Sequence, residues 1–138
     1  MRDKRAKSFV TIMIVIAILA LLLRFAIDWI IKMNIAQNES NAQGTLKLIA
    51  VGLENYAKDN KGLYPASFAV LTEPGHPYLD KDYIAQPPIK GYDYSCPRLE
   101  PSGYSCLASP TKCKVTGNKL YTAKTGGLFI PEECDKKD

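Results

Sequence analysis

The four cysteines are the residues whose type and spacing point most directly to covalent chemistry. They lie in the last third of the chain, at Cys96, Cys106, Cys113 and Cys134. An even number of cysteines clustered in a small exported domain is typical of disulfides. There is no C-x-x-C pair, and the one histidine, His76, is distant, so the pattern disfavours a structural zinc site. We therefore expect two disulfides and no bound metal.

The favoured pairing joins neighbours in the chain, Cys96 with Cys106 and Cys113 with Cys134. The first two cysteines fall on expected strands joined by a short turn, and a turn centred near Glu100 would place them almost opposite each other. A bridge requires Cα atoms no more than about 7 Å apart. The second bridge would tie a loop to the C-terminal tail. Two other pairings stay open, Cys106–Cys113 with Cys96–Cys134, and Cys96–Cys113 with Cys106–Cys134.

The titratable side chains form no catalytic pattern. His76 lies in a Pro-Gly-His-Pro turn, and Asp80 and Asp82 flank a lysine in a loop, which is more typical of solvated charges than of a calcium site. No dense run of Asp and Asn follows Gly126-Gly127, and the C-terminal lysines are too sparse for a nucleic-acid footprint. We expect a protein that is not an enzyme, that has no cofactor and that binds no nucleic acid.

The N-terminal region must position everything that follows. Met1–Ser8 holds most of the net charge of +4 and is followed by the apolar run Phe9–Leu23, after which the apolar character continues to Ile31. A bilayer core of about 30 Å needs about 20 apolar residues, so we expect residues 9–31 to span the membrane. Basic residues beside such a segment stay cytoplasmic, which predicts a cytoplasmic N-terminus, a single pass through the inner membrane and a periplasmic remainder.

Two charged residues interrupt this apolar segment, Arg24 and Asp28. Residues four apart share one helical face, and an isolated charge is costly among apolar groups. We therefore expect Arg24 and Asp28 to pair, either within one helix or between neighbouring helices. Trp29 suits the membrane interface just beyond them.

One helix is expected to continue from the membrane segment into the head. No Gly or Pro occurs from residue 9 to residue 43, and Gly62 with the following Tyr-Pro provides a stop. The spacing predicts a helix over about 8–60. Its second half is amphipathic and should pack on the head through a stripe formed by Leu46, Ile49, Leu53 and Tyr56.

The rest of the chain predicts a small sheet. Alternating apolar residues indicate strands at Lys90–Cys96, Gly103–Ala108 and Lys119–Lys124, with turns over 97–102 and 110–118. Sequential strands with short turns form an antiparallel meander. The expected fold class is α+β, a long N-terminal helix packed on a three- to four-stranded antiparallel sheet.

The segment Asn41–Leu71 resembles the type IV pilin superfamily and, within it, the type II secretion pseudopilins. The family pattern is a helix ending in an apolar-x-x-Tyr unit, then Asp-Asn-x-Gly-x-Tyr-Pro and an apolar stretch. The residues that match it are Leu53, Tyr56, Asp59, Asn60, Gly62, Tyr64, Pro65 and Leu71. The runs Gly91–Tyr94, Gly103-Tyr104 and Thr116–Tyr121 look like the strands of the same heads.

The resemblance implies a basic cytoplasmic leader over 1–8, a transmembrane and filament-core helix over 9–31, and a periplasmic head over 32–138. It implies a structural subunit of a type II secretion pseudopilus or a type IV pilus-like filament. The partners would be like subunits or related pilins, a prepilin peptidase, the inner-membrane assembly platform and membrane lipid. The alternative is an anchored periplasmic binding or accessory module that does not polymerise.

The N-terminus departs from the family pattern, which is Gly followed by Phe-Thr-Leu-Ile-Glu. Here the sequence SFVTIM stands in that place, so leader removal would fall between Ser8 and Phe9, and Met13 would replace the glutamate. A second register places Thr11 at the glutamate position and Asp28 where a helix-bending Pro is common. Neither register supplies the carboxylate that neutralises a neighbouring subunit's N-terminal amine in the family. This departure argues against standard processing, N-methylation and major-subunit status, and because subunits at filament tips in the family can lack this acid, the role of a minor subunit stays open.

Overall fold

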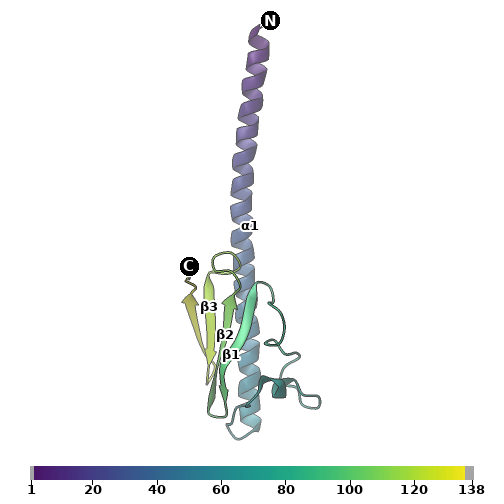
Figure 1. Ribbon diagram of the computed structural model, residues 1–138, viewed down its shortest axis with the longest axis vertical. Coiled ribbons are helices and arrows are strands. Elements are labelled where there is room, and N and C mark those ends of the chain that lie inside the picture. Colours follow the sequence, from purple (N-terminus) through teal and green to yellow (C-terminus); the bar gives the residue numbers. More distant parts are fainter. Residues whose placement is uncertain (1, 136–138) are drawn as a thin grey trace. The chain divides into compact units, whose positions relative to one another are not determined.

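The computed structural model describes residues 2–135 and has an α+β fold. Its elements, in chain order, are the helix α1 (Arg2–Asp59), the 3-10 turn η1 (Phe68–Thr72), and the strands β1 (Tyr92–Glu100), β2 (Gly103–Pro110), β3 (Lys119–Lys124) and β4 (Leu128–Glu133) (Figure 1). The expected fold class is confirmed, because the helix packs on a four-stranded antiparallel sheet. Contacts divide the chain into two units, one ending at Asn34 and the other beginning at Ile35.

Helix α1 begins earlier than the sequence analysis expected and ends where it expected. It starts at Arg2 instead of near Ser8, because the basic leader has no Gly or Pro and is rich in good helix formers. At the other end, Lys61 and Gly62 adopt φ values of 58° and 84°, and the Gly62 amide donates to the Ala57 carbonyl at 2.7 Å. This left-handed ending is the one that Gly62 predicts.

From Ile35 onward, α1 buries one stripe of apolar side chains in the head. The expected positions Leu46, Ile49 and Leu53 are at most 1% exposed, and Tyr56 is half-buried against the same core. On the opposite side of the helix Leu48 is 45% exposed. Periodicity alone therefore identified the face that packs.

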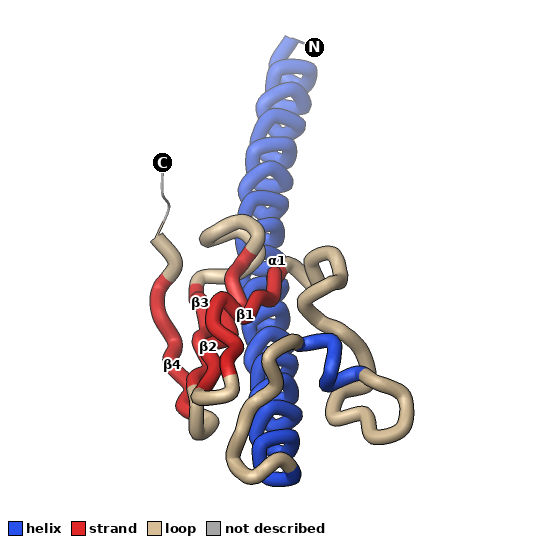
Figure 2. The backbone as a smooth tube through the Cα atoms, turned by 60° about the horizontal axis from the view of Figure 1, so that its bottom comes forward, coloured by secondary structure: helices blue, strands red, loops and turns tan. Residues whose placement is uncertain are grey.

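The four strands form a meander in the order β1-β2-β3-β4, with every neighbouring pair antiparallel. Figure 2 shows this sheet lying along the C-terminal half of α1. Alternate residues of the strands point toward the helix and form the core with it, namely Tyr92, Tyr94, Tyr104, Cys106, Ala108, Tyr121 and Ala123. The other face of the sheet is half-buried or exposed.

Strand β1 is longer than expected. It continues through Pro97 to Glu100, so the turn is the two-residue step Pro101-Ser102, and the expectation of a turn over 97–102 was wrong. The register shifts between Ser95 and Arg98, which marks a bulge. Proline lacks a backbone N–H and is found in sheets at edge strands and at bulges, and β1 provides both at Pro97.

The sequence analysis allowed for a fourth strand but assigned no residues to it, and the structure shows this strand as β4. It pairs with β3 from Lys124↔Leu128 to Lys119↔Glu133, after a turn in which Gly126 and Gly127 have φ values of 84° and 74°. Polar residues and Pro131 hide the alternation that usually identifies a strand. Because β4 is also an edge strand, Pro131 is tolerated there and limits further strand addition.

Candidate functional site

The most distinctive functional feature is the apolar segment of α1 from Phe9 to Met33. Its large apolar side chains are 42–70% exposed, with Ile31 at the lower limit and Phe25 at the upper. Soluble monomers rarely expose contiguous apolar surface of this extent, and such surface marks contact with a membrane or with other proteins. By length and composition, α1 contains one candidate membrane span.

The expected cleavage position lies inside this helix. Both Ser8 and Phe9 belong to α1, and Phe9 is 65% exposed. The Thr11 hydroxyl donates to the Lys7 carbonyl at 2.8 Å, one turn earlier, and so belongs to the same regular helix. Removal of residues 1–8 stays a prediction.

Arg24 and Asp28 do not form an ion pair within the helix. Among the side chains that the structure describes, those of residues 7–135, the only charged groups within ion-pairing distance are Arg98 and Glu100. The expected pair within one helix is therefore not formed. Helical side chains lean toward the N-terminus, so Arg24 extends away from Asp28, and this order of charges is the weaker one at a spacing of four. Pairing between neighbouring helices stays a prediction.

The first disulfide joins Cys96 to Cys106, with Cα atoms 3.9 Å apart. The β1 bulge between Ser95 and Arg98 sets two residues opposite one, and this places Cys96 against Cys106 on the inner side of the sheet. Cys106 is 1% exposed and belongs to the core. This bridge is one of the two that the sequence favours, although the turn lies beyond Glu100 and not at it.

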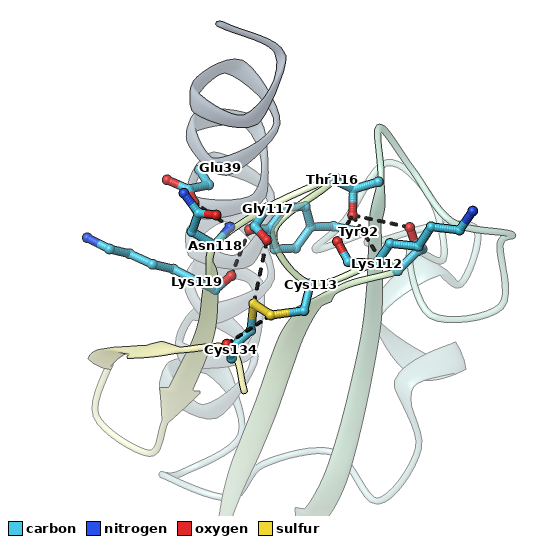
Figure 3. Close-up of a disulfide and its surroundings, with 10 residues drawn as sticks. Glu39, Tyr92, Lys112, Cys113, Thr116, Gly117, Asn118, Lys119 and Cys134 are labelled. Carbon is cyan, nitrogen blue, oxygen red and sulfur yellow. Dashed lines mark hydrogen bonds between the residues drawn. A yellow bond between two sulfur atoms is a disulfide. The ribbon is translucent and has the colours of Figure 1, made fainter. Parts of the chain in front are cut away.

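The second disulfide joins Cys113 to Cys134, with Cα atoms 5.8 Å apart, and is the other favoured bridge. It links the loop after β2 to the residue that follows β4, as Figure 3 shows. The same loop contacts the helix, because the Asn118 amide donates to the Glu39 carboxylate at 2.8 Å and the Asn38 side chain donates to the Thr116 carbonyl at 3.0 Å.

The sequence analysis missed Glu54, which lies beside the buried stripe of α1. Its half-buried carboxylate accepts hydrogen bonds from the hydroxyl of Tyr104 at 3.0 Å, the hydroxyl of Tyr64 at 3.1 Å and the amide of Gly126 at 2.8 Å. These donors come from β2, from the loop after the helix and from the β3–β4 turn. The sequence held one signal for this site, which was that Glu54 is an acidic residue directly next to the apolar stripe.

Two tyrosines that donate to carboxylates, Tyr83 and Tyr104, have raised pKa values. Burial raises the pKa of Tyr104, and its hydrogen bond to Glu54 raises the pKa further. Burial also raises the pKa of Tyr83 to about 12, with a contribution from the 2.7 Å hydrogen bond to Asp80. In both cases the neutral phenol is favoured because the anion would lose hydration or face a carboxylate. These tyrosines are structural donors.

The other candidate residues, His76, Asp80 and Asp82, lie in the loop between η1 and β1. Among the side chains of residues 7–135, which the structure describes, no three His, Cys, Asp or Glu residues meet in an arrangement that could hold a metal ion. His76 and Asp80 are exposed loop residues, and Asp82 caps the amides of Ile84 and Ala85 at 3.0 Å. Compared with known proteins, the chain matches no family model, no curated protein and no solved structure.

Proposed function

We propose that the protein is a structural, pilin-like subunit that sits in the membrane and assembles into a filament through the apolar segment of α1. The observation behind this proposal is that residues 9–33 expose apolar side chains all around the helix. Residues 35–57 of the same helix instead bury their apolar stripe in the head. An unpartnered apolar helix needs lipid or other helices around it.

The connection between the two units supports assembly over simple anchoring. α1 has no break at Asn34, where one unit ends, and no Gly or Pro forms a linker there. An ordinary membrane anchor usually joins its domain through a flexible segment rich in Gly, Ser or Pro. A helix that enters the head directly instead suits a subunit whose head is carried on a helical core.

The proposed partners follow from this role. Copies of the chain or related pilins would pack against the apolar segment, with lipid around it before assembly. A prepilin peptidase would remove residues 1–8, and an inner-membrane platform would assemble the mature subunits. The head would contribute surface to the filament and would not be an enzyme.

Intact-mass measurement is the first test. The chain is produced in a host that has a prepilin peptidase, extracted from membranes and weighed. Loss of residues 1–8, with Phe9 as the new N-terminus, is the expected result. An unprocessed chain would exclude processing at Ser8–Phe9 and would favour the anchored, non-polymerising module.

Site-specific photo-cross-linking tests assembly itself. A photoreactive residue at Ile16, which is 56% exposed, should capture a second pilin-like helix when the assembly platform is present. The matched control is the same residue at Lys58, an exposed position in the last turn of α1. Adducts to lipid alone at Ile16, with or without the platform, would contradict assembly and leave only an anchor.

A further inference from the structure

The two disulfides differ in what surrounds their sulfur atoms. Cys106 is 1% exposed and lies in the core between helix and sheet, so the first bridge has one sulfur in an apolar interior. Cys113 and Cys134 are both half-buried, and neither belongs to the core. The Cys96–Cys106 bridge therefore has one sulfur in the interior, whereas both cysteines of the Cys113–Cys134 bridge lie near the surface.

A hollow of about 530 Å³ opens beside the second disulfide. Cys113 and Cys134 both form part of its wall, together with Ser109, Leu120 and Glu132. The hollow is made by the end of β2, the start of β3 and the end of β4, all within the head. It gives an incoming sulfur a path to this bridge.

The surface bridge also fastens a specific piece of structure. Figure 3 shows Cys113 and Cys134 beside Gly117 and Asn118, with Glu39 of the helix on the other side of Asn118. The Cys134 amide donates to the Asn118 carbonyl at 2.9 Å, and the Asn118 amide donates to Glu39 at 2.8 Å. The bridge thus ends a short chain of contacts that runs from the end of β4 to α1.

We propose that Cys113–Cys134 is a thiol–disulfide exchange site for a dithiol reductant, and that Cys96–Cys106 is an inert structural bridge. The thiolate of the dithiol attacks one sulfur, the S–S bond breaks, and the other cysteine leaves as a thiolate that takes up a proton. The second thiol of the dithiol then resolves the mixed disulfide. The protein gains two thiols, and the dithiol is oxidised to a disulfide.

The leaving group explains the difference in reactivity. Attack on the surface bridge expels a thiolate that water can solvate, whichever sulfur is attacked. Attack on the half-buried Cys96 would expel the thiolate of Cys106 into the apolar core, where its charge is strongly disfavoured. Exchange at Cys96–Cys106 therefore requires unfolding, whereas exchange at Cys113–Cys134 does not.

Opening the surface bridge has a local consequence. The end of β4 would lose its covalent tie to the loop that contains Thr116 and Asn118, and only hydrogen bonds, such as those to Asn38, to Glu39 and from the Cys134 amide, would hold that loop. The β1–β2 pairing would persist, because its hydrogen bonds and the buried Cys96–Cys106 bridge do not depend on the loop. This inference is independent of the proposed function.

The test uses the full-length chain in detergent. The protein is exposed to limiting dithiothreitol, quenched with N-ethylmaleimide at intervals, and mapped by peptide mass. Alkylation at Cys113 and Cys134 should be at least about tenfold faster than at Cys96 and Cys106, since local opening costs less than global unfolding. Parallel modification of all four cysteines, or earlier modification of Cys96 and Cys106, would overturn the proposal.

Hydrogen exchange gives a second measurement. In the variant with Cys113→Ser and Cys134→Ser, the amides of Asn118 and of position 134 should exchange at least about tenfold faster, while those of β2 stay unchanged. The same measurement on partly reduced wild-type chain replaces the variant if the variant does not fold. The Cys96→Ser and Cys106→Ser variant is the control and should keep the Asn118 amide protected. Equal acceleration in β2, or no change at Asn118, would contradict a local exchange site.

Discussion

Both halves of α1 carry many apolar side chains, but those of the first half are exposed and those of the second half are buried along one stripe. Residues 9–33 expose their large apolar side chains by at least 42%, whereas Leu46, Ile49 and Leu53 further along are almost fully buried. The difference lies in the pattern: the first half is apolar on all sides, and the second half is apolar on one stripe. The head covers the stripe of the second half, whereas the described chain leaves the apolar side chains of the first half exposed.

The charged residues of the two halves show the same contrast. Glu54 in the second half accepts hydrogen bonds from Tyr64, Tyr104 and Gly126 of the head. Arg24 and Asp28 in the first half form no ion pair within the described chain. A charge that the fold has satisfied contributes to stability, whereas a charge inside an apolar segment is costly unless another group pairs with it. Mutations in each half should therefore be visible in different measurements.

Leu53→Ala should give the largest change in folding stability. The side chain is 0% exposed, so its truncation removes buried contacts and leaves a cavity, and we expect a loss of about 2–4 kcal/mol. Denaturant unfolding of the full chain in detergent measures the free energy. The matched control is Leu48→Ala, where the side chain is 45% exposed and the change should stay within about 0.5 kcal/mol. Equal losses for the two variants would remove the distinction between the two faces.

Glu54→Ala should have the next largest effect. It removes the acceptor of the buried Tyr104, and an unsatisfied buried donor costs about 1–3 kcal/mol, whereas water can replace the carboxylate at the exposed Gly126 amide. Asn55→Ala, at the exposed neighbouring position, is the control and should change the unfolding free energy by less than about 0.5 kcal/mol. If both variants unfold like the wild type, Glu54 does not fasten the helix to the sheet.

The buried tyrosines predict a loss of stability at high pH. Burial raises the pKa of Tyr104 above its ordinary value of 10.0, so the folded state keeps the phenol proton where the unfolded chain releases it. The contribution of Tyr104 to the free energy of unfolding is complete below pH 10. It falls as the pH rises toward the pKa of Tyr104 in the folded state, by up to about 1.4 kcal/mol per pH unit. The free energy of unfolding should therefore fall less steeply between pH 9 and pH 11 in Tyr104→Phe than in the wild type. An unchanged slope would show that Tyr104 ionises freely in the folded protein.

Local signals account for most of what the sequence could predict. The absence of Gly and Pro, the stripe through Leu53 and the stop at Gly62 are contained within a few helical turns, and they define α1 and its packing face. The favoured disulfides join residues close in the chain, 10 and 21 positions apart. Short separations leave few alternatives once the strands are placed.

Tertiary context accounts for the rest. Strand β4 contains Pro131, and β1 continues through Pro97, and both are permitted only because these strands lie at the edges of the sheet. The contacts of Glu54 connect residues 10, 50 and 72 positions away, and no local pattern reports them. The apolar segment is the reverse case, because its composition is evident in the sequence while the described residues of the chain do not cover it.

The smallest expected effect concerns Arg24 and Asp28, and it tests the first half of the comparison most directly. Because the two side chains do not pair within one helix, coupling between them should depend on a neighbouring copy. We expect Asp28→Ala to reduce membrane accumulation or assembly more than the double variant with Arg24→Ala, with a coupling energy on the order of 0.6 kcal/mol. Accumulation and cross-linked oligomers are measured for the wild type, both single variants and the double variant, with and without the assembly platform. Coupling that appears only with the platform places the pair between helices. A double variant no better than Asp28→Ala under either condition shows that the two charges act separately.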